Sequence, residues 1–343
     1  MPPHGRGRFS DRGLFMAWMQ AVSLQKNGEL IFGAYPGMEA LPGEKLLTVR
    51  YAGVGLDDVA FVRNGPALTR LPRVPGRRFV ACDDMGQFYA VWPLSTCGRC
   101  ARCEEGRGNL CVRKRMLGVD YDGGWSEFVA VPEENMVPLP SGLDPILGVF
   151  AEPLARAINA VRLVAPQAGS VLLSTGDTVE AALAALAALH AGALPFLYAT
   201  SRAAEDRFGQ FAAHLGIETG AACTRRFFDC VVAASRDLLH LPNDLARILP
   251  GGRCVLFGPH VGLEAVPSTV LRDMQEREVT VIGACAATME DMETAVRLLL
   301  TQRDAVRALI DRVEFFREMP ALINGLCEGR LIAPVACPSA DVF

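Results

Sequence analysis

The sequence predicts an α/β protein with two domains, a β-rich domain that carries a metal-binding lobe and a doubly wound parallel sheet. The chain has 343 residues, which is long enough for two hydrophobic cores. Its hydrophobic pattern changes near residue 150, from short β-rich segments divided by Gly and Pro to strands that alternate with helices. Within the first part, four cysteines lie close together as they do in metal-binding loops.

The predicted elements follow this division. In the first part, β-rich segments occupy residues 46–51, 88–92 and 128–132. In the second part the strands are predicted at 170–174, 195–200, 230–234, 253–258 and 279–284. The helices between and after them are an Ala/Leu-rich segment at 179–191, an amphipathic segment ending at 215, and 289–301. Strands that alternate with helices build a parallel sheet with helices on both faces.

The four cysteines have the spacing C-x2-C-x2-C-x7-C, which predicts a structural zinc site. They are Cys97, Cys100, Cys103 and Cys111. Four thiolates surround a tetrahedral ion and leave no open position for chemistry. Glycines in the segment allow its tight turns, and we expect Arg99, Arg102 and Arg107 to offset the thiolate charge. Disulfides or free thiols are the alternative, which this spacing disfavours in a reducing compartment.

Composition and charge indicate which binding partners and which cellular location to expect. A net charge of −4 gives no electrostatic reason to bind nucleic acid or an anionic membrane. No apolar run reaches membrane-spanning length. The seven other cysteines lie mostly in apolar runs typical of buried thiols, so we expect a cytoplasmic protein. Residues 1–15 are basic and lack the apolar run of a signal peptide, so we expect a disordered extension, with Met1 or Met16 as the start.

Several motifs resemble those of zinc-dependent alcohol dehydrogenases of the medium-chain dehydrogenase/reductase family. The cysteine lobe is similar to that family's structural-zinc loop in spacing and in the residues 109–110 (NL) before the last cysteine. Residues 123–129 (GGWSEFV) resemble a second family segment, and residues 152–155 (EPLA) resemble the polyol and threonine dehydrogenase branch.

The resemblance implies a domain division as well as a fold. It predicts a GroES-like domain at 16–153, with a zinc lobe at 97–111, and a Rossmann-type domain at 154–284. The chain would then return to the first domain at 285–343. The strand at 279–284 resembles the edge through which the family pairs two subunits, so a homodimer is expected.

The same resemblance implies that the ligands of a catalytic zinc are missing. Gly55 stands where the family has its first cysteine ligand, within residues 53–60 (GVGLDDVA). Arg77 stands at the place of the histidine ligand, and Arg78 at the place of the glutamate that follows it. Of the usual ligands, Glu152 alone remains, and one carboxylate does not hold a catalytic zinc.

We therefore expect an arginine in place of the missing cation. In this hypothesis Arg77 or Arg78 pairs with Glu152, Asp57 or Asp58, and these five residues are the candidate catalytic residues. The alternative for Glu152 is structural, because a carboxylate before a proline suits the first turn of a helix.

The dinucleotide motif is also degraded. Where the family carries G-x-G-x-x-G, residues 175–180 read TGDTVE, and only Gly176 remains. Asp177 and Glu180 stand three residues apart and are expected to form a capping box that occupies the helix amides. Two carboxylates at this place are expected to weaken dinucleotide binding.

Three further residues are weak candidates for the cofactor site. Ser201 and Arg202 follow the second strand of the parallel sheet, and without a nearby acid they favour NADP over NAD. The same pair also suits an ordinary helix start. His260 follows the strand at 253–258 and is expected either to act as an acid or base or to lie exposed in a loop.

Three functions remain open from the sequence. The chain is a divergent homologue that serves as a binding or partner subunit, a metal-independent NADP(H)-dependent oxidoreductase acting on a small alcohol or carbonyl compound, or a non-redox enzyme that uses the acids and arginines of the cleft. Loss of the zinc ligands alone leaves the oxidoreductase open. Loss of the glycine motif as well favours the other two, with a small molecule or a protein as the partner.

Overall fold

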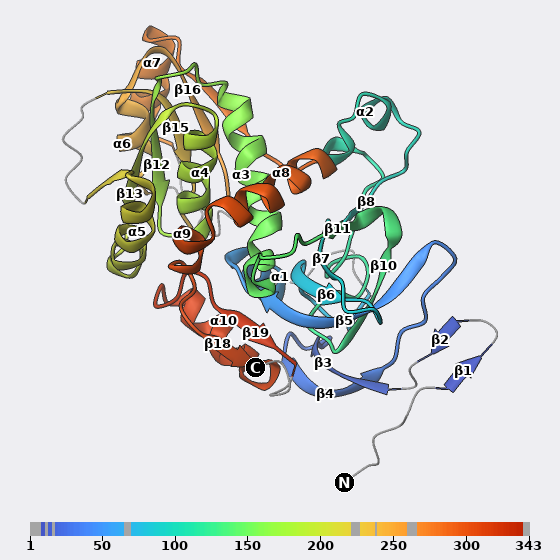
Figure 1. Cartoon of the computed structure of the whole chain (residues 1–343). Coiled ribbons are helices and arrows are strands. Elements are labelled where there is room, and N and C mark those ends of the chain that lie inside the picture. Colours follow the sequence, from blue (N-terminus) through green and yellow to red (C-terminus); the bar gives the residue numbers. More distant parts are fainter. Residues whose placement is uncertain are drawn as a thin grey trace.

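Two bodies make up the computed structural model, a β-rich domain and a parallel α/β domain (Figure 1). The structure describes residues 8–10, 13–15, 18–64, 70–220, 227–236, 239–258 and 266–338. Two short strands, β1 (Arg8–Ser10) and β2 (Gly13–Phe15), pair antiparallel within the segment expected to be a disordered extension. The rest of that segment lies outside the described residues.

The β-rich domain is built on a seven-stranded sheet. The strand order is β11-β7-β6-β5-β19-β18, and β10 pairs with β5 beside this path. The strands are β5 (Glu44–Gly53), β6 (Arg78–Cys82), β7 (Phe88–Val91), β10 (Phe128–Pro132), β11 (Met136–Pro138), β18 (Val313–Phe315) and β19 (Val335–Cys337). Around it lie the hairpin β3 (Trp18–Leu24) and β4 (Leu30–Pro36), the pair β8 (Leu94–Ser95) and β9 (Arg115–Met116), and helices α1 (Leu56–Asn64), α2 (Ala101–Glu104) and α10 (Met319–Cys327). Trp125 and Phe79 are buried at its core.

The second domain is a six-stranded parallel sheet in the order β14-β13-β12-β15-β16-β17. Its strands are β12 (Val171–Gly176), β13 (Leu194–Ala199), β14 (Glu218–Thr219), β15 (Phe228–Ala233), β16 (Ile248–Leu256) and β17 (Thr280–Gly283). Its helices are α3 (Ala151–Val164), α4 (Val179–His190), α5 (Arg202–Leu215), α6 (Leu241–Ala246), α7 (Ser268–Glu276), α8 (Met289–Thr301) and α9 (Arg303–Arg307). Ala and Leu fill α4, and nearly all of its residues are buried because the helix packs between the sheet and α3. The predicted fold class is confirmed.

The chain crosses between the two domains twice. Helix α3 leads from the first domain into the parallel sheet, and α8 packs against α3 on the way back (Figure 1). The last strand, β19, then pairs with β5, placing Val335 opposite Gly53. This antiparallel pair joins the C-terminal segment to the sheet of the β-rich domain.

The structure also bears on membrane-spanning helices and on the state of the cysteines. Among the described residues, no helix is both long and apolar enough to cross a bilayer. The ten cysteines in the described part of the chain form no disulfide. Cys230, Cys254 and Cys337 are buried as expected, but Cys285 is exposed.

A pH-dependent stability is expected from Asp244, which lies in α6 and is 3% exposed. Burial raises the pKa of this carboxyl from 3.8 to about 7, although Arg247 opposes the shift. Between these values the folded protein holds a proton that the unfolded chain has released, so the free energy of unfolding falls as pH rises from about 4 to about 7. At about 1.4 kcal/mol per pKa unit, the loss is on the order of 4 kcal/mol.

We predict that Asp244→Asn flattens this dependence. The measurement is the free energy of unfolding by urea at pH 5, 6, 7 and 8, compared with the exposed control Asp206→Asn. The difference between D244N and wild type should grow in favour of the variant as pH rises. Parallel pH curves for the two proteins would contradict the assignment.

Candidate functional site

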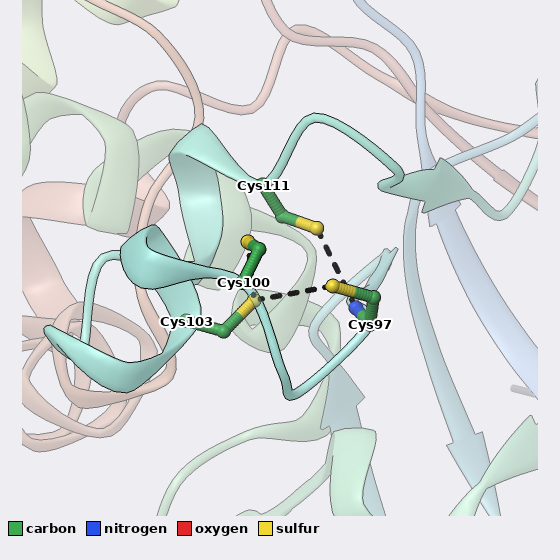
Figure 2. Close-up of side chains that lie close together, drawn as sticks. All are labelled: Cys97, Cys100, Cys103 and Cys111. Atoms are coloured by element: carbon green, nitrogen blue, oxygen red, sulfur yellow. Dashed lines mark hydrogen bonds between the residues drawn. The ribbon is translucent and has the colours of Figure 1, made fainter.

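The four cysteines of the lobe converge as the sequence predicts (Figure 2). They come from the turns around α2 and from the short 3-10 turn Gly108–Leu110. All four Sγ atoms lie within 4.8 Å of one another, and those of Cys100 and Cys103 are 3.5 Å apart. Zn–S bonds of about 2.3 Å place the sulfurs of a tetrahedral site about 3.8 Å apart, so this cluster fits a zinc ion.

The groups that lie near the thiolates differ in part from those expected from the sequence. The backbone N–H of Arg99 is the main cause that lowers the pKa of Cys97 to about 6. Arg113 Nη2 lies 3.4 Å from the Sγ of Cys97, whereas Arg102 pairs with Glu105 at 2.8 Å. Arg102 therefore has an acid on its own helical turn as its ion-pair partner. Arg113, just outside the cysteine segment, faces the cluster instead.

The cysteine lobe is attached to the crossing between the domains. Asn109 donates from its side-chain amide to the carbonyl of Ala286 at 2.9 Å. Lys114 Nζ bonds to the carbonyl of Asn109 at 2.8 Å and lies 3.2 Å from the Sγ of Cys285. A metal that orders the lobe therefore also fixes the segment that leaves the parallel sheet after β17.

A buried arginine occupies the place expected for the catalytic zinc. Arg78, at the start of β6, is 3% exposed. A Cβ added to Gly55 would lie 2.7 Å from its Cζ, so the glycine leaves the space that the guanidinium fills. Nη2 of Arg78 lies 2.7 Å from Asp57, and Nε lies 3.4 Å from Glu152. The pairing expected for an arginine with these two acids is present.

A second arginine completes this cluster. Arg156 lies one turn after Glu152 on α3, pairs with it at 3.7 Å and also bonds to Asp57. Arg78 reaches further, to Glu180 on α4, with Nη2 2.6 Å from the carboxylate. Two arginines and three acids thus form one buried network across the two domains, which we call the Arg78 network.

The other two candidates lie at the edge of this network. Asp58 accepts a hydrogen bond from the backbone N–H of Gly55 at 2.9 Å, and burial raises the pKa of its carboxyl. Arg77 donates to the sulfur of Met116 at 3.5 Å, and its charge helps to lower the pKa of Asp57. Of the five candidates, the structure brings Asp57, Arg78 and Glu152 into direct contact.

Neighbouring opposite charges favour the ionised forms of Asp57 and Arg78. Burial opposes ionisation of Asp57, but Arg156, Arg77 and Arg78 hold the pKa of this carboxyl well below its ordinary range. Burial also opposes the charge of the Arg78 guanidinium. Glu180, Glu152 and Asp57 outweigh it and raise the pKa of that group.

The capping box expected at the start of α4 is wrong. The N-cap residue of this helix, Thr178, makes no side-chain cap and donates to the carbonyl of Ala234 at 2.7 Å. Glu180 points to Arg78 instead, and Asp177 accepts from the backbone N–H of Arg236 at 3.1 Å and pairs with its side chain. Both acids meet arginines that are distant in sequence, which bind them more strongly than neighbouring amides do.

The remaining candidates for the cofactor site each have different local contacts. Gly176 is needed for packing, since its φ is +154° and an added Cβ would lie 2.6 Å from the carbonyl carbon of Ala234. Ser201 caps α5 by accepting from the N–H of Ala204 at 3.3 Å, and Arg202 is exposed. His260 lies outside the described residues.

Little space is left where the two domains meet at Arg78. The cavity there has a volume of ≈ 10 Å³, about the room of one water molecule. Its lining includes Gly53, Pro153, Val179 and Pro334, which come from both domains. Thr178, Val179 and Glu180 are all at most 3% exposed, so the first turn of α4 is covered.

Sequence reasoning missed two arginines of the site. Arg156 follows Glu152 by four residues, a spacing at which helical side chains pair, so this signal was available. Arg236 lies 59 residues after Asp177 with no local pattern between them. Only the parallel order of β12 and β15 brings the two together.

Comparison with known proteins agrees with the fold and the cysteine lobe. The family model "Alcohol dehydrogenase GroES-like domain" matches residues 41–141. The chain is 25% identical over 334 residues to an uncharacterized zinc-type alcohol dehydrogenase-like protein of Haemophilus influenzae, covering 90% of this chain and 95% of that protein. Residues 41–141 thus match the alcohol dehydrogenase GroES-like domain family, and most of the chain is similar to zinc-type alcohol dehydrogenase-like proteins.

Two further relatives extend the comparison. L-galactonate-5-dehydrogenase of Escherichia coli is 28% identical over 285 residues, which cover 76% of this chain and 81% of that enzyme. A protein assigned as a zinc-binding dehydrogenase from Sinorhizobium meliloti, crystallised with NADP, superposes with a TM-score of 0.82 at 24% identity. The superposition covers 94% of this chain and 100% of that one, and it shows the shared fold.

Zinc removal is predicted to destabilise the lobe and the crossing together. Cys100→Ser should abolish zinc binding at the cluster and lower the thermal unfolding midpoint, because a structural zinc contributes directly to folding. The measurement combines metal analysis with thermal unfolding. Cys82→Ser, outside the cluster, is the matched control. A C100S protein that keeps its zinc would contradict the site.

The space beside Gly55 gives a second prediction. Gly55→Ala pushes a methyl group into the Arg78 guanidinium, so it should lower the free energy of unfolding by about 1–3 kcal/mol. Gly33→Ala is the control, because nothing lies within 4 Å of a Cβ at that position. Equal stability of the two variants in urea unfolding would show that Arg78 does not occupy this space.

Proposed function

We propose that this chain is an alcohol dehydrogenase-like protein with one structural zinc and no catalytic zinc, which serves as a binding subunit and transfers no hydride. The observation that carries the proposal is the position of Arg78. Its guanidinium fills the space beside Gly55 and contacts both the remaining ligand candidate, Glu152, and the first turn of the helix α4.

The donor set argues against a catalytic zinc. Such a site needs three protein ligands of the Cys, His or carboxylate type. Here Gly55 offers no donor, Arg78 is cationic, and Glu152 is already engaged by two arginines. A zinc ion at this place would meet the charge of Arg78 at close range in a poorly hydrated site, where like charges repel strongly. The residues present do not fit the metal.

The first turn of α4 argues against a dinucleotide. A pyrophosphate binds a helix N-terminus through free N–H groups and positive charge. At this helix Asp177 and Glu180 bring negative charge, and the turn is buried beneath the other domain. A dinucleotide would have to displace both ion pairs and open the contact between the domains.

Binding is favoured over non-redox catalysis by the burial of the acids. Asp57, Asp58 and Glu152 are the candidate acids and bases; Asp57 and Glu152 pair with arginines of the network, and the buried Asp58 accepts the backbone N–H of Gly55. The space at Arg78 admits about one water molecule, which leaves no room for a small-molecule substrate. A general acid or base must reach its substrate within hydrogen-bond distance.

A metal-independent NADP(H)-dependent oxidoreductase is the second candidate. It is favoured by the NADP bound to the Sinorhizobium meliloti relative. It is also favoured by Ser201 and Arg202, because no acidic residue stands beside them in the sequence to repel the 2′-phosphate of NADP. In such an enzyme Arg78 would polarise a carbonyl in the place of zinc. It requires that the two domains separate in solution.

The proposed subunit is a homodimer paired through β17. This strand is the edge of the parallel sheet, and Val281 on it is 36% exposed. Unpaired strand edges are normally covered, and a second copy of the same edge would extend the sheet.

Calorimetric titration tests the proposal directly. Neither NADPH nor NADH should bind at millimolar concentration to the purified, zinc-loaded protein. The S. meliloti relative, crystallised with NADP, serves as the positive control. Micromolar binding would overturn the proposal in favour of the oxidoreductase. A preference for NADPH that Arg202→Ala removes would then assign Arg202 to the 2′-phosphate.

A further inference from the structure

Two arginines cross the contact between the domains in opposite directions. Arg78 extends from β6 of the β-rich domain to Glu180 on α4 of the parallel domain. Arg236 follows β15 of the parallel domain and extends to the end of α10 in the β-rich domain. The two contacts are made by different side chains and lie on different elements of the β-rich domain.

The Arg78 contact is buried on both sides. The side chains of Arg78 and Glu180 are 3% and 2% exposed, and 2.6 Å separates Nη2 from the carboxylate oxygen. If one partner of such a pair is removed, the other charge stays buried without compensation, and this costs folding free energy. Separating the domains would expose Glu180 while Arg78 kept Asp57, the acid of its own domain.

The Arg236 contact combines a charge pair with a helix end. Its side chain pairs with Asp177, and its Nη1 donates to the carbonyls of Leu326 and Cys327 at 2.9 and 3.2 Å. These carbonyls end α10 (Met319–Cys327), where the helix carries partial negative charge and lacks intrahelical donors. Arg236 therefore acts as a C-terminal cap supplied by the other domain.

Both contacts converge on one turn. Asp177 holds Arg236, and Glu180 holds Arg78, so the start of α4 is joined to the β-rich domain on two sides. We propose that these two contacts form a clamp that keeps the domains closed without any ligand between them. The acids at 177 and 180 supply the negative charge that closes the cleft.

The clamp is independent of the proposed function. It concerns the motion of the domains, whereas the proposed function concerns zinc and hydride transfer. NADPH binding would overturn the proposed function and leave the clamp standing as the closed state of the cofactor-free protein. A protein that binds no cofactor could still open freely.

Hydrogen–deuterium exchange on four proteins tests the clamp. They are the wild type, Glu180→Ala, Arg236→Ala and the double variant. The control is Arg330→Ala, which removes an exposed pair with Glu328 just after α10 without crossing the contact. Exchange is followed in peptides covering 53–56, 176–181 and 324–328, and α8 (Met289–Thr301) reports on global folding.

Each single variant should leave the cleft protected, because the other contact still holds. The double variant should exchange at least about tenfold faster in the three cleft peptides, while α8 is unchanged. Equal protection in the double variant and wild type would overturn the clamp. So would full opening in one single variant, or an increase that includes α8.

A milder pair keeps the test decisive if the double variant fails to fold. Glu180→Gln with Arg236→Lys removes the charge at 180 and the fork that reaches two carbonyls, while it preserves side-chain size. The same selective increase in the cleft peptides is expected, at least about threefold. Protection equal to wild type in this folded protein would overturn the proposal.

Discussion

The buried ion pair between Arg78 and Glu180 is the interaction on which the rest of the site depends. Gly55 leaves the space for the guanidinium, and the pair joins the two domains at 2.6 Å. The same arginine also contacts Glu152. In the proposed function, this one side chain takes the place of the cation of a metal site and neutralises an acid at the expected phosphate site. The two departures from the family motifs are therefore parts of one structural solution.

Such a network constrains the structure more than it stabilises it. Each buried ion loses hydration worth several kcal/mol, and its partners repay this only when the geometry is complete. In the Arg78 network, Arg156 compensates Asp57, and Glu152 lies between both arginines. Replacing Arg78 would leave the buried Glu180 without its partner in the network. The arrangement therefore fixes how the domains meet, and α3, which carries Glu152 and Arg156, connects them.

The sequence predicted the elements well where the signal is local. The strand at 128–132 and the helix at 289–301 have the predicted bounds, because strand and helix patterns are set by neighbouring residues. The cysteine cluster also follows from short spacing. The predicted capping box was wrong because Glu180 has a partner 102 residues away. Local spacing favours the helix amides, and only the tertiary fold brings Arg78 within reach.

A crystal structure with anomalous data at the zinc edge tests most directly whether Arg78 takes the place of a catalytic metal. One zinc peak is expected, among Cys97, Cys100, Cys103 and Cys111, with the Arg78 guanidinium in contact with Asp57 and Glu180. A second zinc peak beside Glu152, with Arg78 turned away, would contradict it.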